Sequence, residues 1–163
     1  MVEKTDSPDV FNGLSINYQW LAKTEQAFGN PEKAKHYFRK SLEVLDWVAE
    51  KIHTAEIQRN LAISYGQMGD IEQELGNLES AKQHYLKSLE ISRRMLVGKN
   101  QTADAIDSFA EAYFRLGTLG GNLDKKYLNE AYRIWCLLAE SCPSVYIYRK
   151  KRDLMKQLLS YPN

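Results

Sequence analysis

Apolar residues recur along the chain at intervals of three and four residues, the spacing of one face of an α-helix. In the first segment they fall at Leu14, Tyr18, Leu21 and Phe28, and in the second at Ala34, Phe38, Leu42, Leu45, Ala49 and Ile52. The pattern predicts helices near residues 11–28, 31–52, 55–75, 78–97, 102–119, 124–141 and 145–160.

The pattern also repeats. Three Gly-Asn pairs begin at Gly29, Gly76 and Gly121, so the steps between them are 76 − 29 = 47 and 121 − 76 = 45 residues. The residues before each pair repeat as well: Tyr18, Leu21 and Ala22 correspond to Tyr65, Met68 and Gly69, and then to Tyr113, Leu116 and Gly117. Each unit therefore contains two helices joined at a Gly-Asn corner.

The residues at these corners fit that interpretation. Glycine adopts the left-handed conformation that ends a helix, asparagine is a preferred N-cap, and Pro31 suits the first helical position. We expect the small residues Ala22, Gly69 and Gly117 to lie opposite Ala34, Ala81 and Ala131, where they let the paired helices approach closely.

The third unit departs from the pattern. Gly117 and Gly121 are four residues apart, whereas Gly69 and Gly76 are seven apart. This shorter spacing predicts a shortened first helix and a break at Gly120-Gly121.

Together these residues resemble the tetratricopeptide repeat family, over roughly residues 10 to 142. The family pattern is a bulky residue, Leu-Gly, a corner Gly, then Ala, an aromatic residue and Ala. It reads here as Tyr65, Met68-Gly69, Gly76, Ala81, Tyr85 and Ser88, and in the first unit as Tyr18, Leu21-Ala22, Gly29, Ala34, Phe38 and Ser41. The units exceed the usual length of about 34 residues by about thirteen. This length is similar to the long repeats of bacterial multidomain signalling proteins.

The resemblance implies an all-α fold, a right-handed α-solenoid of three helix pairs near residues 11–52, 55–97 and 102–141. We expect one domain over residues 10–163, preceded by a disordered segment at residues 1–9. An open stack needs a terminal helix with a polar outer face. Residues 145–160 are predicted to be that capping helix, because they are rich in Lys and Arg and place Ile147, Leu154 and Leu158 on one side.

The composition argues against several classes of function. The 163 residues carry 22 Lys plus Arg against 21 Asp plus Glu, a net charge of +1, which argues against a large nucleic-acid interface. No apolar run is long enough for a membrane span, and two cysteines exclude a disulfide scaffold. We found no H-E-x-x-H, C-x-x-C or P-loop motif. We therefore expect no catalytic residue, no metal, no cofactor and no enzymatic activity, and a cytoplasmic location.

In the family that this chain resembles, the first helix of each pair lines a concave groove. The corresponding positions are Ile16, Gln19, Trp20, Lys23 and Gln26, then Ile63, Gly66, Gln67, Asp70 and Gln73, then Glu111, Phe114, Arg115 and Thr118. A polar lining with a few apolar residues suits an extended peptide. Gly66 lies between Trp20 and Phe114 in the neighbouring units. It is either the floor of an apolar pocket or a site where another helix of this protein packs.

Some family members bind a C-terminal carboxylate with Lys, Asn and Arg side chains of this groove. Of those positions only Arg115 is retained here, and Glu111 reverses a charge. We therefore expect that the groove does not bind the acidic tails of chaperones.

The predicted function is protein–protein interaction, as a scaffold or a sensory and regulatory domain that binds a peptide or protein segment. One alternative is a self-associating repeat module, with Trp20 and Trp47 in the interface. Another is a regulatory subunit of a bacterial signalling effector. RNA binding by helical repeats is a further alternative, which Asp70 and Glu111 in the groove argue against.

Overall fold

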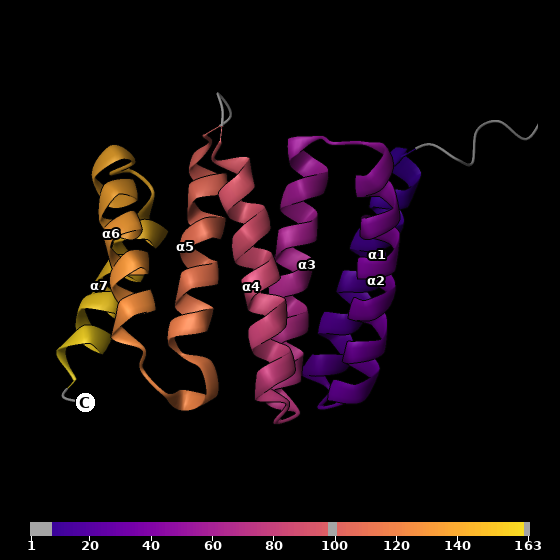
Figure 1. The fold of residues 1–163 in the computed structure, drawn as a ribbon, viewed down its shortest axis with the longest axis horizontal. Helices are drawn as coiled ribbons and strands as arrows, with labels where there is room; N and C mark the ends of the chain where they lie inside the picture. The colour runs from indigo at the N-terminus through magenta and orange to yellow at the C-terminus, as the bar shows by residue number, and fades with distance from the viewer. Residues whose placement is uncertain (1–7, 98–100, 162–163) are drawn as a thin grey trace, which may run out of the picture.

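The computed structural model describes residues 8–97 and 101–161, and the regular elements in these residues are all helices (Figure 1). They are α1 (Pro8–Ala27), α2 (Pro31–Lys51), α3 (Ala55–Glu74), α4 (Leu78–Met95), α5 (Ala103–Gly117), the 3-10 helix η1 (Leu119–Gly121), α6 (Lys125–Ser141) and α7 (Tyr146–Ser160). The predicted all-α fold is confirmed. The segment expected to be disordered lies outside the described residues up to residue 7, but Pro8 and Asp9 already belong to α1.

The helices stand side by side with successive helices antiparallel, from the α1–α2 pair at one end to α6 and α7 at the other (Figure 1). Each helix packs on the next one in the chain, so the pairs stack into an α-solenoid. Their apolar stripes form one core among α1, α2 and α3 and a second among α5, α6 and α7. Ala81, Tyr85 and Leu116 connect the two cores.

The Gly-Asn corners end α1 and α3 in the same way. Gly29 and Gly76 have φ angles of 74° and 81°, in the left-handed region predicted for them. At the first corner the Gly29 amide donates to the Gln26 carbonyl and the Asn30 amide to the Glu25 carbonyl, the paired bonds of a Schellman motif. The same two bonds recur at the second corner, so each helix stops at a fixed residue.

The asparagine side chains do not act as N-caps, contrary to the prediction. The Asn30 side chain donates to the Glu25 carboxylate at 2.9 Å, and that of Asn77 donates to Glu72 at 2.8 Å. A carboxylate five residues earlier is a charged acceptor, which makes the stronger bond. Asparagine therefore ties the corner to the preceding helix.

Small residues do allow close helix approach, but their neighbours are larger than predicted. A Cβ atom added to Gly69 would lie 2.3 Å from a ring carbon of Tyr85, and one added to Gly117 would lie 2.6 Å from a methyl carbon of Leu128. Both distances are far shorter than van der Waals contact. The missing side chains at these glycines thus make room for bulky core residues of the second helix.

The third pair is built as its spacing predicted. Helix α5 has 15 residues against 20 in α3, and Gly120 and Gly121 adopt φ angles of 65° and 77°. The break at these glycines is confirmed.

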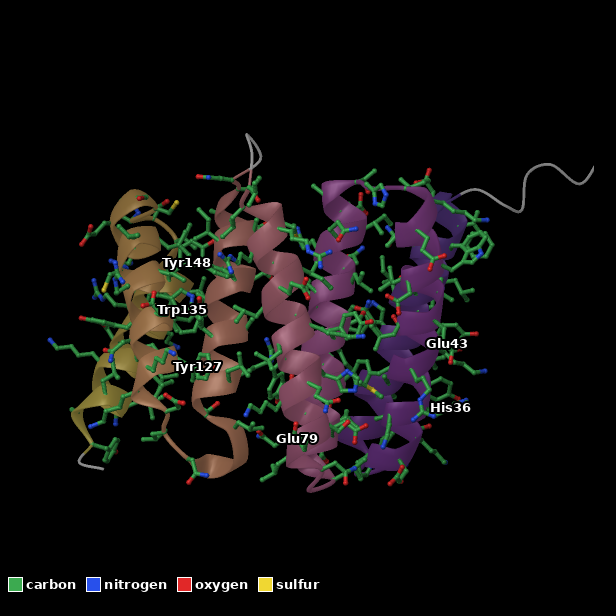
Figure 2. The ribbon with its side chains drawn as sticks, in the orientation of Figure 1. His36, Glu43, Glu79, Tyr127, Trp135 and Tyr148 are labelled. Carbon is green, nitrogen blue, oxygen red and sulfur yellow. The ribbon has the colours of Figure 1, made fainter. Side chains whose placement is uncertain are left out.

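The buried side of α7 differs from the prediction. Of the three predicted residues Leu158 packs on the core, but Ile147 and Leu154 are 48% and 45% exposed, whereas Tyr148 and Met155 are buried. Figure 2 shows Tyr148 near Trp135, whose ring belongs to the same core. Helix α7 carries two apolar stripes, and the packing on α6 buries the one that contains Tyr148 and Met155.

Candidate functional site

Helices α1 and α3, the first helices of the first two pairs, are joined by side-chain hydrogen bonds between polar residues. Each bond links residues about one repeat apart, so it spans neighbouring first helices. The bonds join Asn12 to Glu56 and Asn60, Gln19 to Ser64, and Gln26 to Glu74, at 2.8–2.9 Å. These contacts between α1 and α3 are therefore polar.

The larger hollow on this face has a volume of about 950 Å³ and crosses α1, α3 and α5. Ile16 of α1 lines it, together with the first turns of α3 and α5 and the end of α4. Its charged residues are mixed in sign, and Arg59 and Asp104 lie 3.4 Å apart across it. The remaining lining residues are His53, Ala55, Glu56, Gln58, Asn60, Arg94, Met95, Val97, Thr102 and Ala105.

A chain of alternating charges connects α3, α5 and α7. Arg115 Nε lies 3.0 Å from Asp70 Oδ1, and Arg115 Nη1 lies 3.7 Å from Glu111 Oε2. Lys151 Nζ continues the chain at 2.6 Å from Glu111 and 2.8 Å from Asp107. Arg115 and Lys151 thus each lie close to two of the three carboxylates.

The pKa values of both cations reflect these partners. Burial alone would lower the pKa of Arg115, but Asp70 and then Glu111 raise it above its ordinary value. Burial likewise opposes the charge on Lys151, and the hydrogen bonds to Asp107 and Glu111 raise its pKa. Both groups stay charged at neutral pH, so the chain of charges persists under physiological conditions.

A smaller cavity of about 220 Å³ lies beside these charges, among α3, α4, α5 and α7. Ser92 lines it, fully buried, and its hydroxyl has no hydrogen-bond partner within the described residues. A buried unpaired hydroxyl costs free energy that a bound polar group would recover. The other lining residues are Ala62, Ile63, Ser88, Asp107, Ser108, Glu111, Arg115 and Lys151.

The structure brings together part of the predicted groove. Ile63, Glu111 and Arg115 share the smaller cavity, Ile16 lines the larger hollow, and Asp70 pairs with Arg115. Four others form hydrogen bonds: Gln19 with Ser64 and Gln26 with Glu74 of α3, Gln73 with the Gly120 amide of η1, and Thr118 with the Phe114 carbonyl of α5. Trp20 is exposed, with the Lys23 ammonium 5.7 Å from its ring centre, and the Gln67 side-chain oxygen is buried without a partner among the described residues.

The apolar pocket suggested at Gly66 is not present. A Cβ atom at Gly66 would lie 3.4 Å from Nη1 of Arg115, so the guanidinium covers this glycine. Phe114 turns toward the second core, where its ring centre is 5.9 Å from that of Trp135. Of the two interpretations of Gly66, these distances favour packing by another helix of this protein, because Arg115 belongs to α5.

The prediction missed Arg59, Asn60, Asp107, Ser92 and Lys151. Arg59, Asn60 and Asp107 lie on first helices, N-terminal to the positions that the family pattern includes. The pattern does not reach them because the helices of this chain are longer. One signal was available in the sequence: Arg59 and Asp104, like Asp70 and Arg115, are opposite charges separated by 45 residues, about one repeat. Opposite charges at the repeat distance indicate contacts between neighbouring first helices.

None of the helices within residues 8–97 and 101–161 combines the length and apolar character needed to cross a membrane. Over the same ranges, no group of three or more His, Cys, Asp or Glu residues is placed to hold a metal ion.

The structure is that of an α-solenoid repeat protein: its antiparallel helix pairs are stacked, and side-chain hydrogen bonds and ion pairs join the first helices along one face. Residues 17–44 and 62–94 match a model of the tetratricopeptide repeat family, which supports tetratricopeptide repeats in this part of the chain. Both matched segments lie within the first two helix pairs. Tetratricopeptide repeats generally mediate protein–protein interaction and scaffolding, and the family is typically non-enzymatic. The search of curated proteins found no match to this chain.

Proposed function

We propose that the face formed by α1, α3 and α5 binds an extended segment of a protein partner, and that the chain acts as a scaffold without enzymatic activity or a cofactor. The observation that carries this proposal is the hollow of about 950 Å³ that crosses all three first helices. A hollow that follows the stack suits an elongated ligand, which contacts several repeats at once.

The lining of the hollow indicates the chemistry of the partner. Ile16, Met95 and Val97 offer apolar contact, while Asn60 and Gln58 offer amide groups that pair with a peptide backbone. Cations and carboxylates both occur around the hollow, so a strongly charged segment of either sign would meet like charges. The expected ligand is a segment of low net charge with one or two apolar anchor residues.

A carboxylate clamp is not part of this proposal. Arg115, the position retained from the family's clamp, is neutralised by Asp70 and Glu111. A free carboxylate would have to displace a protein carboxylate that is already in place. The groove is therefore expected to bind internal segments rather than chain ends.

The test is selection of peptides from a random displayed library on the purified chain, followed by measurement of their affinity by calorimetry. Ile16→Glu places a charge in the hollow, and Leu86→Glu is its matched control, because the two side chains are 37% and 41% exposed and Leu86 lies on the second helix α4. We expect Ile16→Glu to weaken binding at least tenfold and Leu86→Glu to leave it unchanged. Equal effects of both variants, or peptides of strong net charge, would contradict the proposal.

The regulatory role and the bacterial origin stay predictions from the family resemblance, and the cytoplasmic location stays a prediction from the composition.

A further inference from the structure

Helix α1 leaves one of its faces open at the end of the stack. The open face consists of six residues spaced by three or four positions, and all six are exposed: Val10, Leu14, Asn17, Leu21, Thr24 and Phe28. Phe28 is 76% exposed, and the neighbouring Trp20 is 66% exposed. Figure 2 shows that His36 and Glu43 of α2 point outward at the same end, so the apolar surface here belongs mainly to α1.

The equivalent positions in the next repeat indicate that this face is suited to packing against another helix. Forty-seven residues later the equivalent positions in α3 are Ile57, Leu61, Ser64, Met68, Ile71 and Leu75, of which the first five are buried and the last is half-buried. They are covered by α2: Ile57, Leu61, Met68 and Ile71 share a core with Leu42, Leu45 and Val48, and Ser64 faces Ser41. The open face of α1 thus has the pattern of an interior helix contact, and no segment within the described residues covers it.

We propose that a second copy of this chain covers the open face, with the two α1 helices packed antiparallel about a two-fold axis. The six residues alternate at intervals of three and four, as do the a and d positions of a coiled coil. In the antiparallel arrangement Phe28 of one copy meets Val10 of the other, Leu21 meets Asn17, and Leu14 meets Thr24. Each layer pairs a large side chain with a smaller one.

Charge and area both allow self-association. None of the six residues is charged, so two identical faces meet without the like-charge repulsion that usually opposes such contacts. Phe28 and Trp20 together leave roughly 300 Å² uncovered if each full side chain presents about 200 Å². Counted on both copies and extended by Val10, Leu14 and Leu21, the contact approaches the roughly 1,000 Å² of a specific interface. A two-fold contact uses the same face on both copies, so assembly stops at the dimer.

The test is sedimentation of the full chain from about 1 to about 100 µM, the range in which a dimer of ordinary affinity dissociates. The wild-type chain is expected to shift from monomer to dimer over this range. Leu21→Glu should weaken the dimer by about 100-fold, since it buries two carboxylates, each costing at least tenfold. Leu137→Glu is the matched control: Leu137 is 62% exposed on α6, at the other end of the stack, and its substitution should change nothing.

A mixing experiment tests the antiparallel pairing itself. Asn17 faces Leu21 of the other copy in this arrangement, so a chain with Asn17→Lys mixed with a chain with Leu21→Glu forms one layer with a Lys–Glu pair. The mixture should then dimerise more tightly than Leu21→Glu alone, with circular dichroism confirming that both variants are folded. A mixture no tighter than Leu21→Glu alone would overturn the antiparallel arrangement.

A wild-type chain that stays monomeric, assemblies larger than dimers, or equal losses in Leu21→Glu and Leu137→Glu would overturn the proposal as a whole. This inference is independent of the groove. Ile16 lies outside the open face, so Ile16→Glu should weaken peptide binding at least tenfold without changing the dimer.

Discussion

At Gly66 a single methyl group and a larger side chain should have opposite effects on stability. The residue is buried in the middle of α3, beneath the guanidinium group of Arg115. An alanine Cβ would lie 3.4 Å from Nη1 of Arg115, which is ordinary van der Waals contact. Gly66→Ala therefore keeps the packing and gains helix propensity, and we expect it to raise the free energy of unfolding by about 0.5–1 kcal/mol.

Gly66→Leu should do the reverse. Atoms beyond Cβ must occupy the space of the guanidinium, so Arg115 moves away from Asp70, which it now contacts at 3.0 Å. Overpacking of this kind costs about 1–3 kcal/mol. For a chain of this length each kcal/mol corresponds to a change of about 2–4 °C in melting temperature.

Thermal and urea unfolding followed by circular dichroism measure both variants. Gly13→Ala is the control for propensity alone, because Gly13 is exposed in α1 and nothing lies within 4 Å of an added Cβ. A double-mutant cycle then isolates the clash: in an Arg115→Ala background, Gly66→Leu should cost about 1 kcal/mol less than in the wild type. A Gly66→Leu variant as stable as wild type, or a coupling energy near zero, would refute the placement of Arg115 over Gly66.

Three further predictions concern the core and its pH dependence. Gly69→Ala should destabilise by about 1–3 kcal/mol in a thermal melt, although alanine favours helix, because the new Cβ would lie 2.3 Å from the Tyr85 ring. Met155→Ala should cost about 2–5 kcal/mol in urea unfolding, since the side chain is fully buried, whereas Leu154→Ala should cost less than about 1 kcal/mol. Burial alone would raise the pKa of Glu72, but hydrogen bonds from Asn77 and Lys35 lower it below its ordinary value. Its contribution is therefore present above the pKa of the unfolded chain and lost as the pH falls through the lower folded value. Urea unfolding should show Glu72→Gln less stable than wild type at pH 7, with the difference shrinking as the pH falls below about 4.

Most of the fold could be predicted from the sequence because local interactions decide it. A helix requires an apolar stripe at intervals of three and four, and its end requires a residue that tolerates positive φ. Gly29 and Gly76 meet that requirement within one turn of chain, so the corners followed from the sequence alone. The repeat then implied that the pairs stack, because identical units present identical faces to each other.

The functional face was only partly predictable. Of the positions carried over from the family, Ile16 lines the larger hollow, and Arg115 lines the smaller cavity and pairs with Asp70; their role in ligand binding stays a prediction. The prediction for Phe114 failed, because a first-helix residue near the edge of the stripe turns either to the groove or to the core. Its ring packs beside Trp135 in this protein, and only the neighbouring helix α6 determines that choice.

Helix α7 shows most clearly what the sequence determines and what only the tertiary structure decides. Its sequence alone determined that residues near 145–160 form an amphipathic helix rich in cations, because spacing and composition are local properties. It carries two apolar stripes, however, and periodicity cannot choose between them. In the tertiary structure the stripe with Tyr148 and Met155 is buried. The same orientation of the helix brings Lys151 to Asp107 and Glu111 on α5. A half-buried ammonium group needs carboxylate partners, and those partners come from a helix more than thirty residues away in the chain.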